Sequence, residues 1–361
     1  MEGLHDATHT PDVKEKAEGY LQNVARTIFQ IEIRQSQSRE VGVRPVPSTL
    51  LTCFLDAIPH ALARDHPKQA ESAQDLLARI VQDLVSMCGE RNVSSHDVLF
   101  ILHQIANRFN ALCLDDPWVR KRAGCRGVEI MTRTPDLGVR WITDRDIDLV
   151  RTLLHVLKDL PYDLPRDVDG VIDVLINVLR TSNTDLNFQS DAANHVRSKL
   201  FHLVGILFPE LQSSNLVVRQ AVHRCIEELV KLSNKSAVEL LTPHRDRILA
   251  GIYSKPLRAL PYPKQIGIIE AVRYCLTLDP PLIELNDEFL RLSHEVLALA
   301  DAEDASLVGR GNVHQHAAEV TRLRVACIKL LTASMPLTDF FSRQHQTRQR
   351  YSNDINALHL F

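Results

Sequence analysis

Apolar residues three and four positions apart recur along most of this chain, between short polar or proline-containing stretches. The clearest case is 208–232, where an apolar segment containing Pro209 leads into a polar turn at 213–215 and then into a second segment. That second segment carries a stripe made of Val222, Cys225, Ile226, Leu229 and Val230. A three-four spacing places side chains on one face of an α-helix. The stretch therefore predicts two antiparallel helices joined by a tight turn.

The second helix of this pair has three echoes elsewhere in the chain. Residues 221–226 (AVHRCI) return fifty residues later as 271–276 (AVRYCL), and the cysteine of 323–328 (LRVACI) follows after fifty-two more. An earlier and shorter echo is 119–123 (VRKRA). Periods of about forty to fifty residues are typical of helical solenoids. Paired helices with a proline in the first and Val-Arg at the head of the second are the unit that HEAT-type repeats stack.

The same spacing predicts about thirteen helices and no convincing β-hairpin. The first starts at Pro11 and meets a polar loop at 35–47, with its apolar face at Val13, Ala17, Tyr20, Leu21, Val24, Ile28 and Ile31. The others are predicted at 48–58, 67–89, 94–112, 117–134, 143–157, 165–179, 188–207, 218–232, from Thr242-Pro243 onward, at 264–278, 286–300 and 316–335. Residues 255–263 form an extended connector, and 301–311 form a loop. These elements predict an all-α, HEAT-like solenoid of antiparallel helix pairs.

Particular residues mark where these helices begin and end. Ser94 has capping-box spacing to Asp97, Asp116 precedes a proline at the first helical position, and Thr143 with Asp146 caps the helix that follows. Pro59 is expected to end or kink its helix, because proline removes a backbone donor and its ring clashes with the preceding turn.

Composition agrees with packed helices. Among 361 residues the hydrophobic fraction is 45%, aromatic residues make up 5%, and there are 13 glycines. With 42 basic and 45 acidic side chains the net charge is -3, so no overall charge favours nucleic acid or an anionic membrane. The N-terminal sequence lacks the apolar core of a signal peptide, and no apolar run is long enough to span a bilayer. We therefore expect a soluble intracellular protein.

The cysteines favour a reducing compartment. There are seven, at positions 53, 88, 113, 125, 225, 275 and 327, and no two form a CxxC pair. An odd number without a secretory signal, at mostly apolar helical positions, predicts small core residues. Redox sensing is the alternative.

Sixteen histidines call for a test of metal chemistry. His294-Glu295 begins like a zincin helix but lacks the second histidine at the fifth position. His195 and His202 could share a face, yet no cysteine or carboxylate accompanies them at ligand spacing, and His314 and His316 lie in or beside a loop. We expect solvated or core histidines and no metal site.

Other motifs of catalysis are missing from the sequence. There is no glycine-rich phosphate loop, no GxSxG elbow and no kinase catalytic segment, and Thr338-Asp339-Phe340-Phe341 has phenylalanine where the kinase motif needs glycine. The sequence therefore predicts no catalytic residues, no cofactor-binding residues, no cofactor and no enzyme activity.

Two groups of basic residues have competing interpretations. Arg120-Lys121-Arg122 with Arg126 could contact nucleic acid or serve in import, but no aromatic ladder accompanies them. We predict instead the solvated side of a helix whose apolar side is Val119, Ala123 and Val128. Arg219 could contact a partner. Its place in the repeat favours hydrogen bonds that tie one repeat to the next.

Residues 255–310, followed by 323–335 and 338–350, closely resemble the helical-repeat region of TRRAP-type transcription coactivators, especially fungal forms. These are giant pseudokinases of the phosphatidylinositol-kinase-related family. The resemblance is strongest over 255–350, whereas 351–361 is a weakly patterned tail outside it. It implies a nuclear, non-catalytic scaffold segment in SAGA-like histone acetyltransferase complexes, docking activators and other subunits. The family's inactive kinase-like domain would lie elsewhere in the longer protein.

We expect 1–361 to form a single solenoid segment. Because neither end has a recognisable polar cap, a fragment or truncated gene product is expected. No direct contact with nucleic acid, membrane or a small-molecule substrate is predicted. The alternative is a helical-repeat transport receptor or another protein-binding solenoid, which would need an acidic concave surface and a small nucleotide-switch partner. A metal-dependent hydrolase would need bound metal and clustered His, Asp and Glu.

Overall fold

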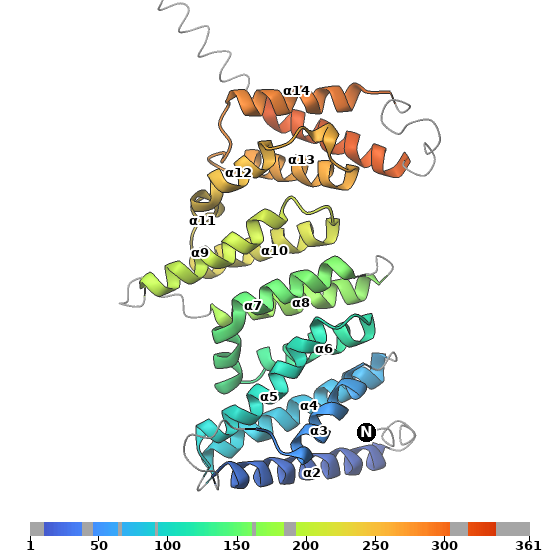
Figure 1. Cartoon of the computed structure of the whole chain (residues 1–361), viewed down its shortest axis with the longest axis vertical. Helices are drawn as coiled ribbons and strands as arrows, with labels where there is room; N and C mark the ends of the chain where they lie inside the picture. Colours follow the sequence, from blue (N-terminus) through green and yellow to red (C-terminus); the bar gives the residue numbers. More distant parts are fainter. Residues whose placement is uncertain are drawn as a thin grey trace, which may run out of the picture. The chain divides into compact units, whose positions relative to one another are not determined.

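The computed structural model describes residues 11–37, 46–63, 67–90, 93–160, 164–183, 193–303 and 317–336. Every regular element within those ranges is helical, which confirms the all-α prediction (Figure 1). The chain divides into two compact units, Met1–Asn187 and Phe188–Phe361, and each is described by itself.

The first unit contains seven labelled α-helices and one 3-10 turn within its described residues. They are α2 (Pro11–Gln37), α3 (Thr49–Leu62), α4 (Pro67–Ser86), η2 (Met87–Gly89), α5 (Ser95–Cys113), α6 (Trp118–Thr132), α7 (Leu137–Asp159) and α8 (Pro165–Ser182). Neighbours along the chain pack side by side, α5 on α6 and α7 on α8, and α6 also contacts α8 (Figure 1). Their facing stripes are buried, so the core runs between successive pairs.

Helices α5 and α6 approach each other closely because small residues lie between them. A Cβ added at Gly124 would lie 2.6 Å from the Cys113 amide nitrogen and 2.7 Å from the Phe109 carbonyl oxygen. Only glycine fits a contact of backbone on backbone at this distance. The pairing of α5 with α6 therefore depends on Gly124.

The second unit repeats the predicted arrangement of paired helices. Its elements are α9 (Ala193–Glu210), α10 (Leu216–Ser233), α11 (Ala237–Leu241), η3 (Thr242–His244), α12 (Arg245–Tyr253), η4 (Leu257–Ala259), α13 (Tyr262–Thr277), α14 (Asp287–Asp301) and a helix at 317–336. Helices α9 and α10 form the pair expected around 208–232 (Figure 1). Asn215 caps α10 by accepting a hydrogen bond from the Val217 amide at 2.9 Å, and the α10 stripe from Val222 to Leu229 is buried.

The predicted cap at Ser94 is confirmed, because its hydroxyl accepts a hydrogen bond from the Asp97 amide at 3.2 Å. Asn286, which was not predicted as a cap, accepts one from the Phe289 amide at 2.8 Å at the start of α14. The predicted start of α6 is one residue too early, because Pro117 occupies the N-cap position and Trp118 is the first helical residue.

The predicted start of α7 is wrong. This helix begins at Leu137 after Asp136, six residues before Thr143, and the Thr143 hydroxyl donates to the Val139 carbonyl oxygen within the helix. Asp146 is buried rather than capping. The first turns of α7 have no side-chain cap, and the packing of the fully buried Trp141 stabilises them instead.

Two further predictions need correction near the start of the chain. Pro59 does not end α3, which continues to Leu62, and the Ala63 amide donates to the Pro59 carbonyl oxygen at 2.9 Å. The predicted apolar face of α2 is wrong in its first turns, where Val13 and Tyr20 are exposed. Helix α2 also runs on to Gln37, into the predicted loop, of which 38–45 lies outside the described residues.

Short elements account for the other differences. Helix α11 was not predicted, although Ser236 and Glu239 form a complete capping box at its start. The segment 255–263, predicted as an extended connector, contains the 3-10 turn η4 and the first two residues of α13.

Candidate interaction surfaces

Arg219 ties two repeats together within the second unit. Its Nε donates to Glu270 Oε2 of α13 at 2.7 Å, and its Nη1 donates to the Ser213 carbonyl oxygen at 2.7 Å. Lys264 Nζ of α13 donates to the Gln212 carbonyl oxygen at 2.8 Å, in the turn before α10. The predicted role of Arg219, a hydrogen-bonded link between neighbouring repeats, is confirmed.

A groove of 270 Å³ lies beside this link. Its walls are formed by Leu216, Pro263 and Ile266 on one side and by Arg322, Val325 and Lys329 of helix 317–336 on the other. We call it the Arg322 groove. Apolar side chains therefore surround a hollow whose rim carries the cations Arg322 and Lys329 and the carboxylate of Glu319.

The charges of this groove are unevenly neutralised. Glu270 pairs with Arg219 in the groove, whereas Arg322 and Lys329 form no ion pair with any residue that the structure describes. Seven residues along an α-helix span about 10 Å, so the two cations lie on one face, two turns apart. The Arg322 groove suits a segment that offers carboxylates two turns apart with apolar side chains between them.

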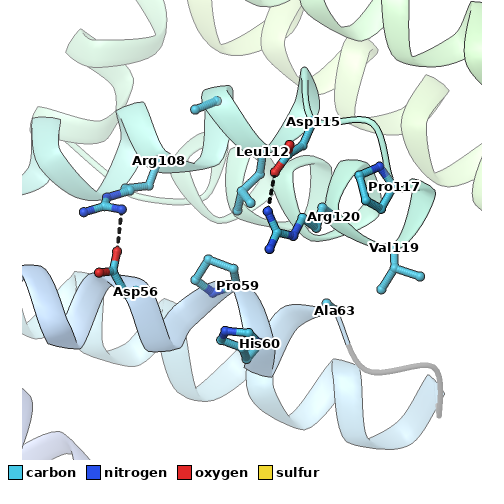
Figure 2. Close-up of a pocket in the computed structure, with 11 residues that line it drawn as sticks. Asp56, Pro59, His60, Ala63, Arg108, Leu112, Asp115, Pro117, Val119 and Arg120 are labelled. Carbon is cyan, nitrogen blue, oxygen red and sulfur yellow. Dashed lines mark hydrogen bonds and ion pairs between the residues drawn. The ribbon is translucent and has the colours of Figure 1, made fainter.

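A second groove, of 680 Å³, lies in the first unit between α3 and the turn that joins α5 to α6 (Figure 2). Arg108 pairs with Asp56 at 2.5 Å, and Arg120 pairs with Asp115 at 2.8 Å. Its apolar lining includes Pro59, Leu112 and Val119. We call it the α3–α5 groove. Because these four charges are paired with each other, it carries less available charge than the Arg322 groove.

The basic run 120–122 with Arg126 does not form the solvated face that the sequence predicted. Lys121 is buried and its Nζ donates to Asp159 Oδ2 of α7 at 2.7 Å. Arg122 lies 3.6 Å from Asp167 of α8.

The remaining residues of this helix complete the correction. Arg126 Nη1 donates to the Leu62 carbonyl oxygen of α3 at 2.6 Å, whereas Arg120 is exposed. Of the predicted apolar side, Ala123 and Val128 are buried but Val119 is exposed. Most of these cations join α6 to its neighbours, because α3, α7 and α8 supply the acceptors.

The histidines that were candidates for metal binding do not gather into a metal site within the described residues. His294 and His202 are exposed, and Glu295 Oε2 accepts from the Leu257 amide at 2.6 Å, which holds η4. The His195 side chain, His314, His316 and 338–341 lie outside what the structure describes. Within the described residues, no three His, Cys, Asp or Glu side chains are placed to hold a metal ion.

The repeated cysteines are core residues, as predicted. Cys225, Cys275 and Cys327 are buried, and burial raises the pKa of Cys225 and Cys275 to about 12 and that of Cys327 to about 11. Their thiols therefore stay protonated at neutral pH. Cys53, by contrast, is exposed.

Sequence reasoning missed both grooves. Arg322 and Lys329 have a recognisable signal, since they are seven residues apart on a face that also carries Val325. The opposite wall comes from residues more than fifty positions earlier, which periodicity alone does not bring together. Among the helices that the structure describes, none is both long enough and apolar enough to cross a membrane.

Comparisons with known proteins agree with this architecture. Residues 1–353 match the model of the family described as the Tra1 HEAT repeat ring region. The SAGA complex/NuA4 acetyltransferase complex subunit Tra1 of Schizosaccharomyces pombe is 35% identical over 244 residues, 66% of this chain and 7% of that protein. The corresponding Saccharomyces cerevisiae subunit is 30% identical over 295 residues, 81% of this chain and 8% of that protein.

An animal relative is more distant. The transformation/transcription domain-associated protein of Homo sapiens is 24% identical over 290 residues, 78% of this chain and 7% of that protein. The chain thus spans less than a tenth of the length of these relatives. With a family match over nearly its whole length, the chain belongs to the Tra1 HEAT repeat ring region family.

Proposed function

We propose that this chain is a non-catalytic scaffold segment of a nuclear transcription coactivator subunit, in histone acetyltransferase complexes of the SAGA and NuA4 kind. The observation that carries the proposal is the family match over residues 1–353, together with relatives named as subunits of those complexes. The same match supports treating 1–361 as one HEAT-like segment; the tail at 351–361 lies outside the described residues.

The roles of polar side chains support a scaffold without catalysis. Arg219, Lys121 and Glu295 all hold neighbouring helices or turns in place. We propose that the chain has no catalytic, cofactor-binding or metal-binding residues and needs no cofactor. Its action is to present surfaces to other proteins.

The Arg322 groove is the docking surface that we favour for activators or other subunits. Apolar walls supply the contact area that stabilises a bound segment, and the exposed Arg322 and Lys329 attract its carboxylates. An amphipathic helix with acidic residues seven apart would satisfy both features.

The test is capture of partners by the full tagged chain from a fungal nuclear extract, followed by mass spectrometry. The wild-type chain is expected to recover acetyltransferase-complex subunits or activators. The double variant Arg322→Glu/Lys329→Glu is expected to recover at least about tenfold less, because like charges now oppose the partner's carboxylates.

The matched control is Lys255→Glu/Arg258→Glu, which makes the same change of charge at exposed residues outside the groove. It should recover as much as the wild type. Equal recovery by both variants would refute the groove as the docking surface. Recovery of import factors without acetyltransferase subunits would instead favour a transport receptor and overturn the proposed function.

A further inference from the structure

Helix α14 carries apolar residues on two different sides. The residues that it buries in the second unit are Phe289, Leu292, Val296 and Leu299. Leu290 and Leu297, by contrast, are 39% and 56% exposed. Together with the exposed His294 and Asp301 they follow a spacing of four, three and four residues, which places all four on one face of the helix. We call Leu290, His294, Leu297 and Asp301 the α14 stripe.

This stripe has a carboxylate at each end. Asp301 ends it, and Asp287 lies one turn before Leu290 at the other end of the helix. Both carboxylates are exposed, and neither forms an ion pair with a residue that the structure describes. The cation nearest to Asp287 along the helix, Arg291, donates from Nη2 to the Tyr253 carbonyl oxygen of α12 at 2.7 Å. The apolar part of the stripe therefore lies between two carboxylates that remain available to a partner.

Asp301 is at an unfavourable place for the helix itself. The helix dipole puts partial positive charge at the first turn, where Asp287 is favourable, and partial negative charge at the last turn. Asp301 is the last residue of α14, and the last turn contains no basic residue. Neither helix stability nor an ion pair with a described residue accounts for this carboxylate. A cation brought by another molecule would remove the repulsion.

We propose that the α14 stripe binds an amphipathic helix of another protein, with apolar residues seven apart and a lysine or arginine beyond each end of them. Leu290 and Leu297 are about 10 Å apart along the helix axis, which matches two turns of a helix packed alongside. Apolar contact supplies affinity, and the charges at both ends fix the register and select the partner. This partner has the opposite charge to the one that the Arg322 groove suits.

A second copy of α14 is a poor occupant of the stripe. If two such helices packed antiparallel, with Leu290 of each facing Leu297 of the other, Asp287 would face Asp301 at both ends. In a parallel pair each carboxylate would face its own counterpart. Like charges meet in either direction, and this repulsion disfavours self-association through the stripe.

Binding of two synthetic peptides to the full chain tests the proposal. Both peptides are helices as long as α14 with leucines seven apart; one has lysines beyond the leucines, and the other has glutamates there. The chain carries Arg322→Ala/Lys329→Ala, so that the cationic groove does not bind the acidic peptide. Fluorescence anisotropy should show at least about tenfold tighter binding of the basic peptide. Hydrogen exchange should slow at 287–301 when this peptide binds.

Three variants identify the residues responsible. Leu290→Ser/Leu297→Ser should weaken binding of the basic peptide at least about tenfold. Val13→Ser/Tyr20→Ser is the matched control, because these two residues of α2 are also exposed, apolar and seven apart, and it should leave binding unchanged. Asp301→Lys should weaken the basic peptide although it favours the helix, so this loss cannot come from unfolding.

Four results would each overturn the proposal. They are binding of neither peptide, equal affinity for both peptides, an equal loss in the two serine pairs, and slower exchange confined to segments outside 287–301.

Discussion

At the scale of single residues, the described structure depends on cations held between helices. Arg219 could be assigned from the sequence, because its place in the repeat is recognisable. Lys121 could not, since its acceptor Asp159 belongs to a different helix, and a run of three basic residues normally indicates a solvated face. The sequence does not show which acceptor on another helix packing brings close to a given cation.

Arg219→Met should destabilise the second unit. The change leaves the Glu270 carboxylate and the Ser213 carbonyl without the donors they have in the native state, which costs roughly 2 kcal/mol in the free energy of unfolding. Urea unfolding followed by circular dichroism measures it. Arg322→Met, at an exposed cation without an ion pair to a described residue, is the control and should shift the midpoint little. Equal shifts in both variants would contradict the assigned tie.

His244 should make stability depend on pH. It is buried, its ring centroid lies 4.2 Å from that of Phe201, and Nε2 has no hydrogen-bond partner among the described residues. Burial lowers the pKa of His244 below 6.5; the positive charges of Arg247 and His202 lower it further, and a backbone hydrogen bond with Phe201 opposes them. Below about pH 6.5 the unfolded state therefore binds more protons than the folded state, and stability falls as pH falls.

The measurement is the urea midpoint at about pH 7.5 and about pH 5.5. The wild type should be less stable at the lower pH, and His244→Phe should show a smaller loss. Some loss should remain, because burial also lowers the pKa of His223 and His103. An unchanged pH dependence in His244→Phe would contradict this prediction, because it would mean that the pKa of His244 is the same in the folded and unfolded states.

At the scale of elements, the helices that begin with a side-chain cap could be predicted, as α5 and α14 show. Helix α7 could not, because its start at Leu137 has no side-chain cap and depends on the burial of Trp141. Helix α11 is only 5 residues long, too short for a periodic pattern to appear. Where the local sequence signal is missing or too short, tertiary contacts therefore determine which residues form a helix.

Gly124→Ala should separate α5 from α6. The added methyl group would lie within 2.7 Å of backbone atoms of Cys113 and Phe109, so the helices must move, at a cost of roughly 2–3 kcal/mol. Gly170→Ala on α8 is the matched control, since no atom lies within 4 Å of its added Cβ. That change should raise the free energy of unfolding by about 0.5–1 kcal/mol, because alanine has a higher helix propensity than glycine. Thermal unfolding of both variants tests the contrast, and a stable Gly124→Ala protein would disprove the close packing.

At the scale of the whole molecule, the forty-to-fifty-residue period was enough to predict stacked helix pairs, and the family match agrees with it. The grooves needed coordinates. Leu216, Pro263 and Val325 meet in one hollow only because three helices of the second unit converge there. Repetition predicts how neighbouring repeats pack, but not which exposed side chains border a binding surface.

Binding through the Arg322 groove should weaken with salt. Exposed cations attract carboxylates through solvent, and this attraction is screened as the Debye length falls from about 10 Å at 0.1 M to about 3 Å at 1 M salt. Titration of a captured partner into the full chain at several salt concentrations should give a steep loss of affinity for the wild type. The loss should be shallower for Arg322→Ala/Lys329→Ala, and parallel salt dependences would exclude these cations as the source.

The most direct test of the scaffold account is hydrogen exchange of the full chain with and without the acetyltransferase-complex partner that it captures. The account predicts slower exchange on binding at 214–219, 263–270 and 319–329, the segments that border the Arg322 groove. Slower exchange confined to other segments, or no capture of such a partner by the folded chain, would contradict it.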